Sequence, residues 1–224
     1  MITEVAPPRR LYRLGRQPDP WVPPDWAYAG EDGTFGNRFD DPRRTYRVLY
    51  ASSSRLGCFL ETLARFRVDV ALEAALAEIS GPDDYVPLGV VPREWRGGRS
   101  IGAADAAGIF AAIGSSESLA TLRTVLAATV IELELEDLDA ATIRLSVPRA
   151  FTQAVSRYVY DTGRFDGVSY RSRYGDDVEN WAVFEPFTAL EPHAQPEPVD
   201  IFDADFVAAL TIHRLLVEEA ATAD

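Results

Sequence analysis

The stretch GTFGNRFDDPRRTYRVLYASSSRLGCFLETLARF, residues 33–66, holds the clearest succession of structural elements in the chain. Residues 46–51 within it (YRVLYA) are rich in aromatic and β-branched side chains and are bounded by turn residues, which predicts a strand. Three serines follow, and one of them can cap a helix over residues 55–66. The stretch therefore predicts a polar loop, a strand and a helix in direct succession.

These three elements carry side chains that suit the binding of a nucleotide. Arg38 lies in the loop, Tyr50 ends the strand, and Glu61 lies at the edge of the apolar stripe of the helix. A guanidinium can bind phosphate, an aromatic ring can pack on a flat heterocycle, and a carboxylate can stabilise a developing cation. We interpret the stretch as half of a pocket for a dinucleotide. The ordinary alternatives are a surface ion pair for Arg38, core packing for Tyr50, and pairing of Glu61 with Arg65.

The segment before this stretch supplies one more candidate. Residues 11–16 (LYRLGR) predict a short strand, in which alternation places Arg13 on the face opposite Tyr12 and Leu14. An arginine in that position must face solvent, a partner or a ligand. Residues 17–32 are rich in proline and tryptophan and predict a loop or lid.

The rest of the chain mixes helical and strand patterns. Helices are predicted over 70–79, 103–113, 116–130, 148–161 and 203–220. Strands are predicted over 85–91, 131–138, 167–173 and 181–187, a loop ending in a strand over 94–101, and a proline-rich linker over 191–198. Because strict alternation of strand and helix is absent from this pattern, we expect an α+β fold with mainly antiparallel sheets and surrounding helices, in one domain over residues 1–224.

Charge and composition exclude several classes of protein. The net charge of −13 argues against direct binding of nucleic acid. Residues 1–67 nevertheless hold 11 arginines against 8 acidic residues, whereas the remainder holds 11 arginines against 27 acidic residues. The local excess of positive charge suits a small anionic ligand.

Cysteine use and hydropathy indicate where the protein resides. No run of about 18 apolar residues predicts a membrane span, and the N-terminus lacks the pattern of a secretory signal. Cys58 is the single cysteine and cannot form an internal disulfide, so we expect a cytoplasmic protein. One cysteine and two scattered histidines also predict no built-in metal site of the zinc type.

Taken in order, the motifs resemble the RES family, which is named for its arginine, glutamate and serine. The resemblance rests on LYR, GNRFDDP, VLYASS, the LE pair whose glutamate follows the tyrosine by eleven residues, GVSYRSR and NWAVFEP. It spans about residues 11–186, so the core of the domain is expected over 11–187, followed by the linker and last helix over 191–220.

The resemblance implies an activity, a fold and partners. RES proteins are toxins of bacterial toxin–antitoxin pairs, usually encoded beside an Xre-type antitoxin, and their fold is similar to that of ADP-ribosyltransferases. They degrade NAD+ by phosphorolysis or hydrolysis and release nicotinamide. NAD+ is thus expected as a substrate rather than a cofactor, with phosphate as a possible co-substrate. A homo-oligomer is a further possible assembly.

The resemblance also assigns site residues. The family arginines fall on Arg13 and Arg38, the tyrosine on Tyr50 and the glutamate on Glu61. Arg13 and Arg38 are expected to bind the pyrophosphate or inorganic phosphate, and Tyr50 to pack on the nicotinamide. Glu61 is expected to bind the ribose 2′-hydroxyl and oppose the positive charge of an oxocarbenium ion, which makes Glu61 and Arg13 the candidate catalytic residues.

The family serine has three candidates for substrate binding. Ser169 and Ser172 both lie in the later motif, and in some relatives a serine just before a helical glutamine is implicated, where this chain has Thr152. Two readings compete with NAD+ cleavage: the same pocket could transfer ADP-ribose to a macromolecule, or the protein could be a non-catalytic interaction partner.

Overall fold

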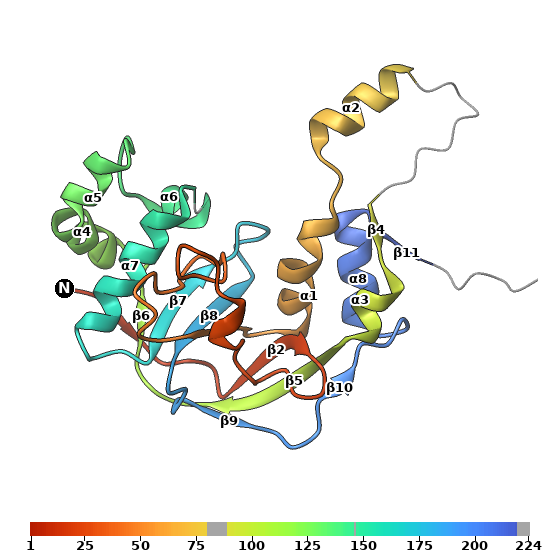
Figure 1. The fold of residues 1–224 in the computed structure, drawn as a ribbon, viewed down its shortest axis with the longest axis horizontal. Coiled ribbons are helices and arrows are strands. Elements are labelled where there is room, and N and C mark those ends of the chain that lie inside the picture. The colour runs from red at the N-terminus through yellow and green to blue at the C-terminus, as the bar shows by residue number, and fades with distance from the viewer. Residues whose placement is uncertain (80–88, 146, 219–224) are drawn as a thin grey trace, which may run out of the picture.

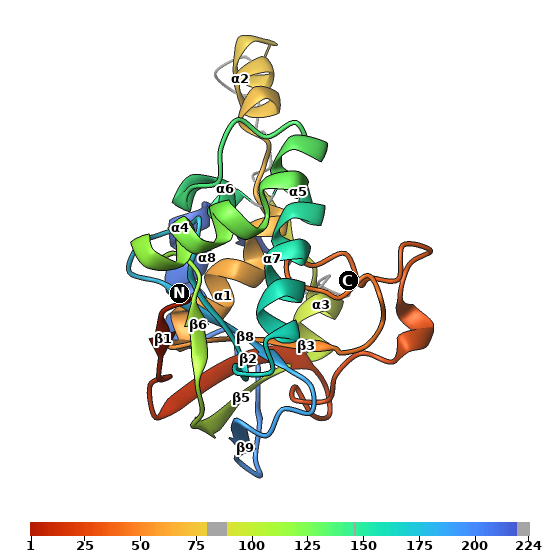
Figure 2. The same cartoon turned by 90° about the vertical axis from the view of Figure 1, so that its left-hand side faces the viewer.

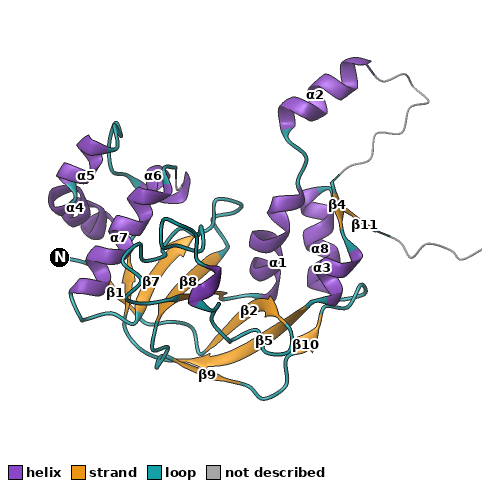
Figure 3. Cartoon of the chain, in the orientation of Figure 1, coloured by secondary structure: helices purple, strands orange, loops and turns teal. Residues whose placement is uncertain are grey.

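The computed structural model describes residues 1–79, 89–145 and 147–218. These residues form the predicted α+β fold, in which helices cover one face of a mixed, mostly antiparallel sheet (Figure 3). The strands of this sheet are β1 (Glu4–Val5), β2 (Arg10–Arg16), β3 (Val48–Ser52), β5 (Arg99–Ala106), β6 (Phe110–Ala112), β7 (Gly167–Arg171), β8 (Glu179–Phe184), β9 (Leu190–Pro192) and β10 (Glu197–Pro198). The helices are α1 (Arg55–Leu63), α2 (Val70–Ile79), α3 (Arg93–Gly97), α4 (Ser116–Val125), α5 (Ala127–Glu132), α6 (Ala140–Leu145), α7 (Arg149–Asp161) and α8 (Ala204–His213).

The strand and helix of the opening stretch lie at the centre of the architecture. The sheet order is β1-β6-β7-β8-β3-β2-β5-β10, with β9 also paired to β5, so β3 lies between β8 and β2. All pairings in it are antiparallel except β6 with β7. The side chain of Ser54 caps α1 by accepting a hydrogen bond from the backbone N–H of Gly57, 3.0 Å away. The predicted strand, cap and helix are therefore confirmed.

Two helical groups pack on this sheet (Figure 1), in which β3 lies between β8 and β2. The first contains α4 to α7, and its core includes Phe39, Val48 and Tyr170. The second contains α1, α3 and α8, and its core includes Cys58. Tyr50 packs against the first core from β3, the strand that α1 follows. Side chains from the two groups thus approach one another above the middle of the sheet.

The opposite face of the sheet carries a third core, to which the predicted loop over residues 17–32 contributes Trp21. This loop contains one 3₁₀ turn (Trp26–Tyr28). Trp21 from this loop packs with Leu11, Leu49 and Trp181. A Cβ atom at Gly102 of β5 would lie 2.5 Å from the indole nitrogen of Trp21. The small residues of β5 therefore make room for this loop.

Several predicted elements were wrong. Residues 103–113 form the end of β5 and all of β6 rather than a helix, because β5 pairs with β2, and β6 pairs with β1 and β7. The pattern of residues 131–138 also allows a helix end in place of the favoured strand, and the structure has the helix end: α5 ends at Glu132, and Glu134 follows with a positive φ of 53°. Their alternating leucines pack on the first core from a turn.

The C-terminal part also differs from its prediction. The expected linker over 191–198 contains most of β9 and all of β10, both of which pair with β5. The last helix ends at His213, where Arg214 adopts the left-handed conformation that terminates α8. Residues 94–101 were predicted as a loop that ends in a strand. They contain most of α3, followed by the first residues of β5.

The helix predicted over 70–79 is present as α2, which extends away from the sheet in both Figure 1 and Figure 2. The strand predicted over 85–91 lies mostly outside the described residues, and its end is β4 (Val90–Val91), which pairs in parallel with β11 (Leu216–Val217). Within the described ranges, no helix combines the length and the apolar character that a membrane span requires.

Close packing of α1 on the sheet depends on a glycine. A Cβ atom at Gly57 would lie 2.2 Å from Oγ of Ser52, which is buried and donates to the carbonyl of Glu179. We expect Gly57→Ala to lower the free energy of unfolding by about 2 kcal/mol, because Ser52 must move and lose this bond. Urea unfolding measures the change. The double variant with Ser52→Ala should recover part of the lost free energy of unfolding, because the smaller side chain leaves space for the new methyl group. A Gly57→Ala variant that unfolds at the same urea concentration as the unsubstituted protein would contradict this packing.

Candidate active site

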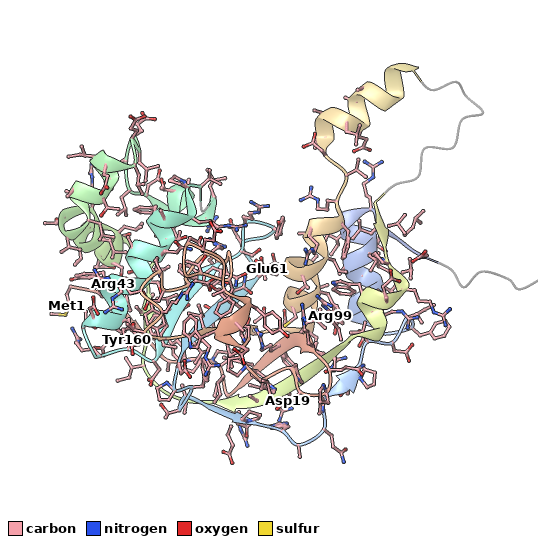
Figure 4. All side chains as sticks on the ribbon, in the orientation of Figure 1. Met1, Asp19, Arg43, Glu61, Arg99 and Tyr160 are labelled. Atoms are coloured by element: carbon pink, nitrogen blue, oxygen red, sulfur yellow. The ribbon has the colours of Figure 1, made fainter. Side chains whose placement is uncertain are left out.

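A cavity of about 450 Å³ lies between the two helical groups, above β3. Its size falls in the usual range for small-molecule sites. Its walls come from six parts of the chain, namely β2, the loop between β2 and β3, β3 itself, α1, the start of α7, and the turn between β7 and β8 with its flanking strands. Arg13, Arg38, Tyr50 and Glu61 all line it, and Figure 4 shows Glu61 on the side of α1 that faces the first helical group.

Arg13 is held from β2 by backbone carbonyls. Its Nε donates to the carbonyl of Pro20 at 2.6 Å and its Nη1 donates to the carbonyl of Tyr50 at 2.8 Å. Burial lowers the pKa of the Arg13 guanidinium to about 10, which leaves it charged at neutral pH. No carboxylate of the described residues lies within 4.0 Å of its nitrogens. A fixed cation without an acidic partner is suited to an anionic ligand.

Arg38 is fixed in a similar way on the other wall. Its Nη2 donates to the carbonyls of Ile143 at 2.6 Å and Arg144 at 3.2 Å, which ties the loop before β3 to α6. Its guanidinium lies 4.8 Å from the centre of the Tyr170 ring, within cation–π range. Both contacts orient the charge toward the cavity that Arg38 lines.

The loop that carries Arg38 is organised by Asp40, which sequence reasoning did not single out. One carboxylate oxygen accepts from the backbone N–H groups of Phe35 at 2.9 Å and Asn37 at 2.8 Å. The other accepts from the hydroxyl of Tyr50 at 3.2 Å. Burial raises the pKa of the Asp40 carboxyl, although these hydrogen bonds oppose the shift. Asp40 therefore joins the loop to the aromatic ring that lines the cavity.

Removing that acceptor should destabilise the protein. We expect Asp40→Ala to lower the free energy of unfolding by about 3 kcal/mol, because three donors lose their partner in a buried place. Asp40→Asn is the matched control, since its amide oxygen can still accept the two backbone bonds, and it should keep most of the stability. Denaturant unfolding measures both variants. If both variants lost the same free energy of unfolding, these hydrogen bonds would not be the source of the stability that Asp40 provides.

Glu61 is oriented by a partner from a distant strand. The side-chain amide of Asn180 donates to Oε1 of Glu61 at 2.7 Å. Asn180 lies on β8 opposite Ser52 and is only 2% exposed. Burial, and next the negative charge of Glu61, raise the pKa of the Tyr170 hydroxyl. Among the described residues the structure shows this bond from Asn180, a residue that the sequence analysis did not single out, rather than a pair of Glu61 with Arg65.

Two further arginines line the cavity and had not been predicted. Arg149 is the first residue of α7, and Arg173 lies in the turn after β7. The lining thus contains four guanidinium groups and one carboxylate, that of Glu61, in a chain of net charge −13. Such a concentration of positive charge attracts anions from solution.

The three hydroxyl candidates lie elsewhere. Ser172 is 1% exposed, and its Oγ accepts from the backbone N–H of Tyr174 at 2.9 Å. Thr152 is fully buried and donates to the carbonyl of Arg149 at 3.1 Å. Ser169 lines a second cavity of about 250 Å³ at the end of β6. The structure does not bring these side chains into the main cavity, although Ser172 and Thr152 bond to the backbone of residues that line it.

The arrangement defines what chemistry the cavity can support. Four cations can bind phosphoryl groups, the Tyr50 ring offers an apolar surface, and the oriented carboxylate of Glu61 can stabilise positive charge. Cys58 also lines the cavity, but burial raises the pKa of its thiol to about 12, so it is a poor nucleophile. In the part of the chain that the structure describes, no three His, Cys, Asp or Glu residues gather as a metal site would require.

Comparison with known proteins gave one match. A family model described as the RES domain matches residues 10–203. No curated protein and no solved structure matched the chain.

Proposed function

The chain belongs to the RES domain family, and from that premise we propose that it cleaves NAD+ at the bond between nicotinamide and ribose, with phosphate or water as acceptor. The observation that carries the proposal is the carboxylate of Glu61, oriented by the buried amide of Asn180 in a cavity that is otherwise cationic. A carboxylate in such a place binds a group that becomes positive during reaction.

The chemical demand of NAD+ cleavage matches this carboxylate. As the bond to nicotinamide breaks, the ribose acquires oxocarbenium character, and nicotinamide leaves as a neutral base that needs no proton. In the proposed complex Glu61 binds the 2′-hydroxyl of that ribose and opposes the positive charge at C1. The bond from Asn180 holds one carboxylate oxygen and leaves the other for the substrate. Tyr50, restrained through its hydroxyl by Asp40, packs on the nicotinamide ring.

The pyrophosphate is assigned to the fixed arginines. Arg13 and Arg38 each use part of their N–H groups on backbone carbonyls, which sets their orientation and leaves further N–H groups for phosphate oxygens. A guanidinium held in advance loses little conformational entropy on binding. Ser169, Ser172 and Thr152 have no part in this proposal, because they lie outside the cavity that it uses.

Family membership extends the proposal to biological role and partners. We propose that this protein is the toxin of a toxin–antitoxin pair and that its partner is an Xre-type antitoxin. The exposed surface of α8, which includes Ile212, is available in the described structure for such a partner or for a second copy of the chain.

The test is an assay of NAD+ carrying a label in its adenylate half, run with and without inorganic phosphate. The proposal expects free nicotinamide together with a labelled small molecule, which is ADP-ribose if water is the acceptor and its 1-phosphate if phosphate is. Label on a macromolecule would favour ADP-ribose transfer instead. If folded protein released no nicotinamide, the proposed cleavage of NAD+ would be wrong. The hypothesis of a non-catalytic interaction protein would then remain.

A further inference from the structure

A pair of stacked aromatic rings lies in the loop between β2 and β3, beside the main cavity. The ring centres of Trp26 and Phe35 are 5.4 Å apart, and the ring planes are inclined by 29°. Phe35 directly precedes Gly36, and Trp26 follows Pro24 by two residues; Gly36 and Pro24 both line the cavity. The proposed cleavage of NAD+ has so far given this pair no role.

Packing of the protein core does not account for the pair. Within the described residues, neither ring belongs to any of the three hydrophobic cores or packs against one. Both side chains are half-buried, and the segment between β2 and β3 stands out from one side of the molecule in Figure 2. Two large aromatic side chains that remain accessible next to a cavity are typical of a binding surface.

Phe35 is fixed by the same carboxyl group that restrains Tyr50. The backbone N–H of Phe35 donates to Asp40 at 2.9 Å, and the hydroxyl of Tyr50 donates to the other oxygen of Asp40 at 3.2 Å. Asp40 is buried, so it links the two aromatic residues through a rigid part of the loop. The site therefore holds two separate aromatic surfaces, which suits a ligand with two flat heterocycles.

Trp26 is held in place by Arg47. The guanidinium of Arg47 lies 6.0 Å from the centre of the Trp26 ring, and its Nη1 donates to the carbonyl of Pro24 at 3.4 Å. Arg47 is itself paired with Glu185. Among the described residues, Phe35 stacks on no ring other than Trp26. Trp26 thus supports the pair, and Phe35 has aromatic surface left for a ligand.

The cations that can bind the pyrophosphate lie next to Phe35. Gly36 has a positive φ of 76°, and a Cβ atom there would lie 3.3 Å from Nη1 of Arg149, so this arginine reaches the backbone beside Phe35. Arg38 lies two residues beyond Gly36 in the same loop. A dinucleotide whose phosphates contact Arg38 and Arg149 therefore has Phe35 within reach of its adenosine half.

We propose that Trp26 and Phe35 form the subsite for the adenine base of NAD+; this rests on the proposed function. Adenine stacks on the Phe35 ring, which Trp26 supports, while Tyr50 packs on the nicotinamide at the other end of the substrate. The subsite favours the dinucleotide over nicotinamide mononucleotide, because the mononucleotide has no second base to stack.

Calorimetric titration with AMP and with nicotinamide mononucleotide tests the subsite without depending on catalysis. Phe35→Leu keeps an apolar side chain but loses the flat ring, so we expect it to raise Kd for AMP by about 10-fold, and Trp26→Leu to raise it by about 5-fold. Kd for nicotinamide mononucleotide should stay within about twofold in both variants. In the assay of nicotinamide release, Phe35→Leu should raise KM for NAD+ by about 10-fold with little change in kcat.

Tyr28→Leu is the matched control. Tyr28 lies in the same 3₁₀ turn as Trp26, is 75% exposed and does not line the main cavity. This variant should leave both Kd values and the KM for NAD+ unchanged. Urea unfolding of all three variants shows whether each is folded at the temperature of the titration.

The outcomes separate this subsite from NAD+ cleavage itself. Equal rises of Kd for AMP and for the mononucleotide in folded variants would indicate a general disturbance of the loop and would overturn the subsite. The subsite also fails if both variants bind AMP as the unsubstituted protein does, or if the unsubstituted protein binds no AMP. If the expected changes in AMP binding were found in a protein that releases no nicotinamide, the proposed cleavage would be wrong and the adenine subsite would stand.

Discussion

Glu61→Gln is expected to lower kcat for nicotinamide release by about 10²–10³-fold while the protein stays folded. The substitution keeps the shape of the side chain and an oxygen that can still accept from Asn180, whose amide lies 2.7 Å from Glu61. It removes the negative charge that opposes the positive charge of the ribose in the transition state. KM for NAD+ should change little, because the charge acts mainly on the transition state.

A matched control separates this effect from a change in overall charge. Glu132 ends α5, is exposed, and does not line the main cavity, so Glu132→Gln should keep kcat within about twofold of the unsubstituted protein. Circular dichroism and the urea midpoint check folding of both variants. If Glu61→Gln retained full activity, the carboxylate would have no role in the reaction and the proposed mechanism would be wrong.

Arg38→Gln is expected to raise KM for NAD+ by about 10–100-fold with a smaller change in kcat. The substitution removes a charge-assisted contact to the pyrophosphate, which is present in the ground state as well as in the transition state. Arg38→Lys should not restore binding. A single ammonium cannot hold the carbonyls of Ile143 and Arg144 and reach a phosphate in the planar arrangement that a guanidinium allows.

The control for this prediction comes from the same loop. Arg43 is exposed and does not line the main cavity, so Arg43→Gln should leave KM for NAD+ unchanged. Because Arg38 also ties the loop to α6, urea unfolding must accompany the kinetics. A folded Arg38→Gln variant with an unchanged KM for NAD+ would remove Arg38 from phosphate binding.

Local patterns were enough to predict the elements on which the site is built. The strand before Tyr50, the serine cap and the helix of Glu61 follow from β-propensity, capping and helical spacing, which act within a few residues. The alternation that set Arg13 apart from Tyr12 and Leu14 is also local, and these two neighbours pack on the second core while Arg13 lines the cavity.

The errors occurred where tertiary contacts override local preference. The segment Ala103–Ala106 has the composition of a helix, yet it pairs with β2 as a strand. Gly102, just before it, would place a Cβ 2.5 Å from the indole nitrogen of Trp21, and Ala104 belongs to the same core as Trp21. No pattern within the segment records the presence of Trp21, which lies about eighty residues earlier in the chain.

For the site, local patterns in the chain are sufficient to place an arginine, a tyrosine and a glutamate on consecutive elements, because propensity, capping and periodicity act along neighbouring residues. The folded arrangement was needed to learn that Asn180 bonds Glu61, that Asp40 restrains Tyr50, and that Arg149 and Arg173 join the same cavity. The bond between Asn180 and Glu61 and the gathering of the arginines depend on strand register and on the packing of two helical groups on one sheet. Residues more than a hundred positions apart meet through these features, and no local pattern in the chain encodes such a distance.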